Sequence, residues 1–209
     1  MDDRLTAIDR RSVTGAIVAG GQNTRFAGQP KGLLTVGGVR IIDRVATALR
    51  AVASDLMLVA NDPEASRWLP GVPVHRDERN ERASLVGLAT AIRHAKGAVL
   101  VVAWDMPFVV PELLRLISSE LAPRSAAVVP HGPRGPEPMC ALYTPRCLPI
   151  IERALDRGEL RLGPLVTQLP GLVRIPLERV SGVGDPARLF FNVNSPADLE
   201  LAERLARTA

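Results

Sequence analysis

The sequence is poor in several features, and each shortage excludes a class of protein. Aromatic residues make up only 3% of the 209, cysteine occurs only as Cys140 and Cys147, and no long unbroken apolar run is present. Few aromatics leave little surface on which nucleic-acid bases could stack. Two thiols supply neither a disulfide framework nor four zinc ligands, which favours a reducing compartment. The longest apolar run, residues 98–110, contains Asp105 and is too short to span a bilayer.

Lysine is also scarce, because Lys31 and Lys96 are the only two among 26 basic residues and the rest are arginine. A genome's base composition can favour arginine codons, so this bias alone implies no function. An ammonium group is a compact, mobile point charge, whereas a guanidinium group is a rigid planar fork. Each lysine is therefore a candidate for a position that the fork does not fit.

The rest of the composition is that of an ordinary globular protein, with 46% hydrophobic and 23% charged residues and a net charge of +4. Basic and acidic residues are interspersed, which fits a small anionic ligand better than a nucleic acid. Residues 1–12 are charged and lack the apolar segment of a secretory signal. We expect a flexible arm there, one domain over 13–209, a cytoplasmic location, and neither a nucleic-acid partner nor a membrane.

Two kinds of apolar segment alternate along the chain. Short continuous runs predict buried strands, and runs with apolar residues three and four apart predict helices. Strands are expected over 15–19, 56–60, 72–75, 98–103, 126–129, 139–143 and 172–177, and helices over 40–53, 84–95 (capped by Ser84), from Pro111, over 148–155 and after a Ser195–Asp198 cap. Residues 131–138 are typical of a Gly/Pro loop.

This alternation predicts the α/β class, with a three-layer α/β/α sandwich whose mainly parallel, Rossmann-like sheet has helices on both faces. Ligands of such sheets bind at the carboxyl ends of the strands. We therefore expect the chemistry in the loops after Ala19, Ala60, His75 and Ala103.

The first of these loops, residues 20–31, reads GGQNTRFAGQPK. Its glycines and small polar residues can turn backbone N–H groups around an anion, and Arg25 and Lys31 add positive charge. A triphosphate needs both features. The spacing fits neither a Walker A motif nor a Rossmann fingerprint, and a surface loop with two chance cations stays an alternative.

Two carboxylates follow other predicted strands. Asp105 comes directly after the buried strand and could bind Mg²⁺, a hard cation that takes oxygen ligands; alternatively it caps the turn before Pro107. Asp77 follows the strand that ends at His75 and could touch a nucleotide or position the metal; alternatively it belongs to a solvated charge cluster.

Asn192 and Asn194 lie two residues apart in a possible strand, where both side chains would point to one side. They could bind a metal, a phosphate or the backbone, or serve only the turn before the last helix. The three histidines match no metal-ligand spacing, and both cysteines are expected to be buried thiols.

Four motifs in this order resemble the molybdenum cofactor guanylyltransferases, a branch of the nucleotidyltransferases. They are VAGGQNTRFAGQPKGLL, GVPVHRD with the helix start SLVGL, AWDMPF, and FNVNSPADL, and the resemblance covers about residues 14–206. The family has Gly-Pro at the helix start, where this chain has Ala83-Ser84. The Ala-Gly-Gly form at 19–21 favours the guanylyl branch over the cytidylyl branch.

The resemblance implies a nucleotidyltransferase fold and transfer of GMP from GTP to the terminal phosphate of molybdopterin or the molybdenum cofactor, with release of pyrophosphate and Mg²⁺ as cofactor. The acceptor's phosphate oxygen would attack the α-phosphorus in line. Other molybdenum cofactor proteins are possible partners. The resemblance also implies roles for individual residues. Arg25 and Lys31 would contact the triphosphate, and Asp105 would be a metal ligand. The nucleotide cradle would come from Val18, Ala19, Gly20 and Gly21, further nucleotide contacts from Asn61, Asp77 and Gly87, and pterin-side or metal-side contacts from Asn192 and Asn194.

Three alternatives stay open. One is a nucleotidyltransferase that uses CTP, as a molybdopterin cytidylyltransferase does, or that activates a sugar phosphate. Another is a non-catalytic nucleotide- and pterin-binding partner, and the third is a nucleic-acid-binding protein. Arg134 and Arg161, in polar stretches, are further candidates for pterin contacts.

Overall fold

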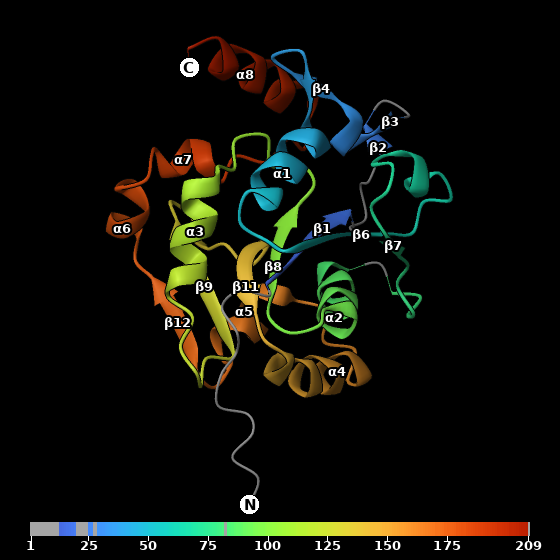
Figure 1. Cartoon of the computed structure of the whole chain (residues 1–209), viewed down its shortest axis with the longest axis vertical. Coiled ribbons are helices and arrows are strands. Elements are labelled where there is room, and N and C mark those ends of the chain that lie inside the picture. The colour runs from blue at the N-terminus through green and yellow to red at the C-terminus, as the bar shows by residue number, and fades with distance from the viewer. Residues whose placement is uncertain (1–12, 20–24, 27–28, 82, 209) are drawn as a thin grey trace, which may run out of the picture.

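A computed structural model describes residues 13–19, 25–26 (backbone only), 29–81 and 83–208, so the predicted arm over 1–12 lies outside the described residues. A sheet of eight strands forms the centre, in the order β10-β9-β11-β8-β1-β6-β7, and β12 pairs with β9 (Figure 1). The strands are β1 Thr14–Ala19, β6 Asp55–Ala60, β7 Val74–His75, β8 Val99–Ala103, β9 Ala127–Gly132, β10 Gly135–Pro136, β11 Cys140–Tyr143 and β12 Leu172–Ile175.

The sheet is mainly parallel, as the alternation of segments predicted. β1 pairs in parallel with β6 and β8, and β7 continues the parallel set beside β6. β11 is the exception within the centre, since it runs antiparallel to both β8 and β9. Because β11 is antiparallel to each of them, β8 and β9 run in the same direction.

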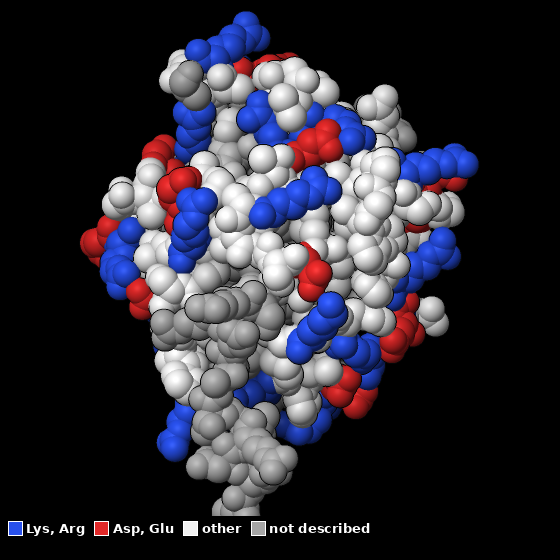
Figure 2. All heavy atoms as spheres, in the orientation of Figure 1, with Lys and Arg blue, Asp and Glu red and all other residues white. Residues whose placement is uncertain are grey.

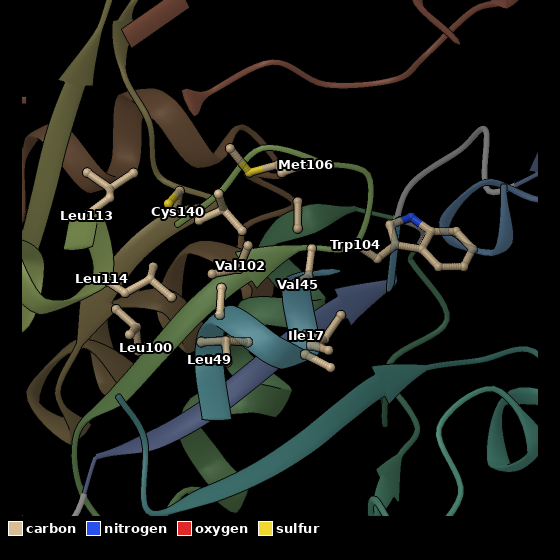
Figure 3. Packing of buried hydrophobic residues seen from close by; sticks show 14 of the residues in the cluster. Ile17, Val45, Leu49, Leu100, Val102, Trp104, Met106, Leu113, Leu114 and Cys140 are labelled. Carbon is tan, nitrogen blue, oxygen red and sulfur yellow. The ribbon is translucent and has the colours of Figure 1, made fainter. Parts of the chain in front are cut away.

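Helices cover both faces of this sheet, which confirms the three-layer architecture (Figure 1). Within β1, Ile17 packs on one face with α1 and α3, whereas Ala16 and Val18 pack on the other face with α2 and α4. Figure 3 shows the first of these cores, built from aliphatic side chains of β1, β8, α1 and α3. The helices are α1 Ile41–Arg50, α2 Ser84–His94, α3 Pro111–Ser119, α4 Leu148–Asp156, α5 Leu162–Thr167, α6 Leu177–Ser181, α7 Pro186–Leu189 and α8 Pro196–Arg207.

Several short elements complete the described chain. Two small hairpins pair β2 (Arg25–Phe26) with β3 (Gln29–Pro30) and β4 (Thr35–Val36) with β5 (Val39–Arg40), and three 3₁₀ turns are η1 Lys31–Leu33, η2 Ala65–Arg67 and η3 Pro145–Cys147. A Glu203 carboxylate on α8 accepts a hydrogen bond from the Gly37 N–H at 3.2 Å, which ties the second hairpin to the last helix.

Four local predictions were wrong. Ser84 is the first helical residue and caps nothing, because the preceding Ala83 is the N-cap without a side-chain cap. Residues 131–138 are not a plain loop, since β9 continues to Gly132 and pairs with β10. The late strand ends at Ile175, where Pro176 precedes α6. No strand covers Asn192 to Asn194.

The predicted cap of the last helix is confirmed. Ser195 Oγ accepts from the Asp198 N–H, and the Asp198 carboxylate accepts from the Ser195 N–H, which forms a capping box with Pro196 in the first turn. Burial alone would raise the pKa of Asp198, but hydrogen bonds from Ser195 and from the Asn194 N–H outweigh it, so its pKa lies below the ordinary value.

Basic and acidic side chains are interspersed over the face that Figure 2 presents, as the sequence indicated. Among the described residues, no helix combines the length and the apolar composition that crossing a bilayer requires.

Candidate functional site

The carboxyl ends of β1, β8, β6 and β7 meet at one edge of the sheet. Because these strands are parallel neighbours, the segments that follow them lie side by side. The Trp104 N–H donates to the Val18 carbonyl at 3.3 Å, which ties the end of β8 to the end of β1. Asp105, Asn61 and Asp77 follow β8, β6 and β7 at this edge, as expected. Gly20 and Gly21 lie outside the described residues, as does the side chain of Arg25.

Trp104 forms the surface on which the turn with Lys31 is built. It is buried at the end of β8, apart from the aliphatic side chains labelled in Figure 3, and its ring stacks on Trp68 at 5.2 Å between centroids. A Cβ added at Gly32 would lie 2.6 Å from the Trp104 ring, so only glycine lets η1 lie flat on this indole. This close packing fixes where Lys31 leaves the backbone.

Lys31 is buried, with only 5% of its surface exposed, which is rare for a lysine. Its Nζ donates to Asn194 Oδ1 at 2.8 Å. The Asn194 N–H in turn donates to the Asp198 carboxylate at 3.0 Å. The capping box of α8 therefore positions Asn194, and Asn194 positions Lys31. Two segments 163 residues apart in sequence thus place one ammonium group at the sheet edge.

Asp105 is the second charged group at this edge. The Val193 N–H donates to the Asp105 carbonyl at 2.9 Å, which joins the segment before α8 to the end of β8. Burial raises the pKa of the Asp105 carboxyl, and the nearby charge of Lys31 acts in the opposite direction. Its Oδ1 is buried and has no hydrogen-bond partner among the described residues.

A buried carboxylate oxygen without a partner is costly unless something binds it. A hard divalent cation would satisfy this oxygen, so Asp105 fits a Mg²⁺ ligand. In the part of the chain that the structure describes, no three His, Cys, Asp or Glu side chains form a metal-binding group. Mg²⁺ commonly takes one or two protein carboxylates and completes its shell with water and substrate phosphates.

A second group of side chains lies beyond β6. Asn61 Nδ2 donates to the Asp77 carboxylate at 2.8 Å, and the Asp77 N–H donates to Asn61 Oδ1 at 2.8 Å. The Thr90 hydroxyl of α2 donates to the other carboxylate oxygen at 2.8 Å. Asp77 is therefore held in one orientation, and the two separately predicted candidates Asn61 and Asp77 lie together at the edge of the sheet.

Gly87 lets α2 lie close to β1. A Cβ there would lie 2.7 Å from Val18 Cγ1, closer than side-chain atoms pack. Val18 is itself buried and branched at Cβ, so it has little freedom to move away. The glycine thus has a packing role beneath the predicted cradle, and its contact with the nucleotide stays a prediction.

We expect Gly87→Ala to lower the free energy of unfolding by about 1–2 kcal/mol, because overpacking costs about 1–3 kcal/mol and the gain in helix propensity returns up to about 1 kcal/mol. Urea denaturation measures the change. Gly163→Ala on α5 is the matched control, since a Cβ there meets no atom within 4 Å. It should be neutral or slightly stabilising. If Gly87→Ala behaves like this control, the close approach of α2 to β1 is refuted.

The two asparagines do not act as a pair. With no strand over this segment, Asn192 Nδ2 donates to the Phe190 carbonyl at 2.8 Å, whereas Asn194 reaches Lys31. Arg134 is exposed on the turn between β9 and β10. Arg161 precedes α5 and lines a separate pocket of about 380 Å³ formed by residues 158–168, which none of the other candidate residues lines.

Sequence reasoning missed Thr90, Trp68 and Gly32. A signal existed for the tryptophans, because the chain has only two and they stack on each other. Nothing local marks Thr90, which is one of several small residues on the buried face of α2. Glu137, which lines a pocket beside α7, was passed over as part of the Gly/Pro segment.

Known proteins are similar to this chain in sequence and in architecture. Residues 15–169 match the family model described as the MobA-like NTP transferase domain. A molybdenum cofactor guanylyltransferase of Desulfosudis oleivorans is 32% identical over 92% of this chain and 95% of its own length. A probable molybdenum cofactor guanylyltransferase of Deinococcus radiodurans is 35% identical over 92% and 95% of the two chains.

A crystal structure of molybdopterin-guanine dinucleotide biosynthesis protein A from Archaeoglobus fulgidus superposes with a TM-score of 0.79 at 27% identity, covering 94% of this chain and all of that one. The family-model match runs from β1 to α5 and so includes the carboxyl ends of β1, β6, β7 and β8. The chain therefore belongs to the MobA-like NTP transferase family and, within it, to the molybdenum cofactor guanylyltransferases.

Proposed function

We propose that this protein transfers GMP from GTP to the terminal phosphate of molybdopterin or of the molybdenum cofactor and releases pyrophosphate. The observation that carries the proposal is the buried Lys31 ammonium group near the buried Asp105 carboxylate at the carboxyl edge of the sheet. One oxygen of that carboxylate has no hydrogen-bond partner within the described part of the chain. A positive charge next to an oxygen ligand suits a polyphosphate that carries its own divalent cation.

The nucleotide lies on the β6–β7 side of Lys31 in this proposal. Asp77 and Asn61 are held there by mutual hydrogen bonds and by Thr90. Such fixed polar groups can orient a ribose or base at low entropic cost. The Gly-rich segment 20–24 and Arg25 would complete the phosphate site.

The reaction requires no protein nucleophile. An ionised phosphate oxygen of the acceptor attacks the α-phosphorus of GTP, a new P–O–P bond forms, and the bond from the α-phosphorus to the bridging oxygen breaks. The electron pair leaves with pyrophosphate. Lys31 stabilises the negative charge that develops on the leaving group, and Asn194 keeps the ammonium group in place.

Asp105 would hold the metal ion. When bound, Mg²⁺ supplies Lewis-acid stabilisation of charge on the phosphate oxygens. The chain contributes the position of this carboxylate. Asp105 follows the end of β8, and the Val193 N–H holds its backbone in place by donating to the Asp105 carbonyl. A cytoplasmic location fits these substrates and the two buried thiols.

Nucleotide-dependent thermal shifts test the base preference. We expect GTP with Mg²⁺ to raise the midpoint of unfolding more than CTP, ATP or UTP, because a ligand that binds only the native state stabilises it in proportion to its affinity. A larger shift with CTP would assign the chain a cytidylyl donor instead. Equal shifts with all four nucleotides would remove the support for a guanine-specific site.

A further inference from the structure

A second pocket lies at the same edge of the sheet, on the side away from Asp77. Its volume is about 180 Å³, and it is lined by Pro133, Arg134, Glu137, Pro186, Ala187, Phe190 and Phe191. The turn between β9 and β10, with Glu137 just after β10, forms one wall, and the start of α7 with the two phenylalanines forms the other. Because β9 runs in the same direction as β8, the carboxyl end of β9 opens to the edge that holds Asp105.

The position of this pocket suits an acceptor. In the sheet order, β6 and β7 lie on one side of the central β8–β1 pair, and β9 and β10 lie on the other. With the ribose and base toward Asp77, the β9–β10 side of the edge is free for the acceptor. The acceptor oxygen then attacks the α-phosphorus opposite the leaving pyrophosphate, which Lys31 holds in the proposed reaction.

Glu137 is the polar group that the pocket offers. Its backbone is fixed, since its N–H donates to the Pro130 carbonyl at 2.9 Å and its carbonyl accepts from the Cys140 N–H at 3.0 Å. A Cβ at Gly132 would overlap the Glu137 carboxyl and would lie 2.9 Å from the Phe190 ring, so a glycine leaves room for this side chain. Among the described residues, its carboxyl group has no hydrogen bond or ion pair, and Arg134 is the charge that acts on it.

Burial and a nearby positive charge act on this carboxyl in opposite directions. Burial raises the pKa of Glu137 to about 7, and the charge of Arg134 acts in the opposite direction. An ionised carboxylate in such a place gains most from a ligand that donates two N–H groups at once, as a guanidinium fork does.

The volume limits what such a ligand can be. The pocket volume of about 180 Å³ is roughly six times the ~30 Å³ that one water molecule occupies in the liquid. It is smaller than the ~300–1,000 Å³ of pockets that enclose whole ligands. The pocket therefore has room for one flat ring system of a larger substrate. The Phe190 and Phe191 rings give it an apolar wall, and Phe191 is supported by Phe108 at 6.2 Å between centroids.

We propose that this pocket, through Glu137, binds the 2-amino-4-oxopyrimidine edge of the acceptor's pterin ring. The ring N–H and the exocyclic amino group are adjacent donors that match the two carboxylate oxygens. Guanine carries the same edge, so the same chemistry could come from the nucleotide. The inference rests on the proposed function, which supplies a pterin as the acceptor.

Ligand binding without turnover tests the pocket separately from the reaction. The full-length protein is titrated with pterin, followed by its fluorescence, and with 4-oxopteridine, the same ring without the amino group. We expect wild type to bind pterin at least tenfold more tightly than 4-oxopteridine. We expect E137Q, which loses one acceptor and gains a donor, to lose this preference while the GTP–Mg²⁺ thermal shift stays unchanged.

E178Q is the matched control, because Glu178 is exposed on α6 and does not line the pocket. It should retain both the preference and the nucleotide shift, and urea denaturation checks that both variants are folded. Equal binding of the two pteridines by wild type, or no binding, would overturn the proposal. An E137Q variant that loses the GTP shift would place guanine here and overturn the pterin assignment. Failure of GMP transfer with the pterin preference intact would instead refute only the proposed reaction.

Discussion

Lys31→Ala is expected to lower the turnover number by about 10²–10³-fold, the usual effect of removing one preorganised group that stabilises charge in a transition state. Lys31 is buried and its ammonium group is oriented by Asn194, so no other described lysine can replace it. Steady-state release of pyrophosphate measures the change. Thermal unfolding should still show a folded protein, because the buried Asp105 carboxyl, which loses the nearby charge of Lys31, can take up a proton instead.

Lys96→Ala is the matched control. Lys96 is exposed, with 81% of its side chain accessible, and pairs with Asp55 at 3.4 Å at the opposite edge of the sheet. Such a surface pair contributes little, and we expect unchanged turnover. Near-normal turnover of Lys31→Ala would contradict the assigned role.

The shape of the cation is tested by Lys31→Arg. Gly32, the neighbour of Lys31, packs closely on the Trp104 indole, and the ammonium group donates to Asn194. We expect a planar guanidinium to misplace the charge and to retain little activity. A fully active Lys31→Arg enzyme would show that charge alone matters at this position.

Asp105→Asn is expected to lower Mg²⁺-dependent activity by about 10³-fold or more, because a metal ion contributes several kcal/mol of charge stabilisation and each 1.36 kcal/mol is a factor of ten. A Mg²⁺ titration of activity measures it, and the concentration for half-activation should rise. Asp55→Asn is the control, since Asp55 lies exposed at the start of β6, away from the site. A variant whose metal titration is unchanged would show that Asp105 merely caps a turn.

Stability separates a functional carboxylate from a structural one. Burial raises the folded-state pKa of Asp105, so the native state binds more protons than the unfolded state between the ordinary and the raised value. The carboxylate therefore costs stability increasingly as the pH rises through that range. In the absence of metal, Asp105→Asn should unfold at a higher denaturant concentration than wild type at pH 7, and the difference should shrink below pH 4. Lower stability at pH 7 would mean that the carboxylate supports the fold.

The sequence predicted the fold and the place in the fold of most candidate site residues, because both follow from local patterns. Continuous apolar runs marked β1, β6 and β8, and the rule that ligands bind at the carboxyl ends of parallel strands led to Asp105 and Asp77. Lys31 was found because a chain with so few lysines places one at the end of a Gly-rich loop.

Other features depend on contacts between distant segments and left no local pattern. The stacking of Trp104 on Trp68 and the bond from Thr90 to Asp77 join separate elements. The antiparallel direction of β11 depends on the hairpin-like return after β10, not on its own apolar run. α6 and α7 are too short to show a helical period, so the sequence analysis did not separate them from loops.

The pair of asparagines shows the limit of spacing arguments. Two residues apart in a strand would share a face, but the chain turns into the α8 cap instead. Asn194 therefore reaches Lys31, while Asn192 bonds to the backbone of Phe190. A metal-side or pterin-side role for Asn192 remains a prediction, and the contact of Asn194 with Lys31 supports a role in aiming the cation.

The most direct test of the central proposal is to follow both products of one reaction. Purified protein is incubated with Mg²⁺, molybdopterin and GTP or CTP, and pyrophosphate and the pterin dinucleotide are quantified together. We predict equal amounts of pyrophosphate and guanine dinucleotide, formed only when GTP, Mg²⁺ and the acceptor are all present. Pyrophosphate released without the acceptor, a cytosine product in preference to the guanine one, or no dinucleotide at all would contradict it.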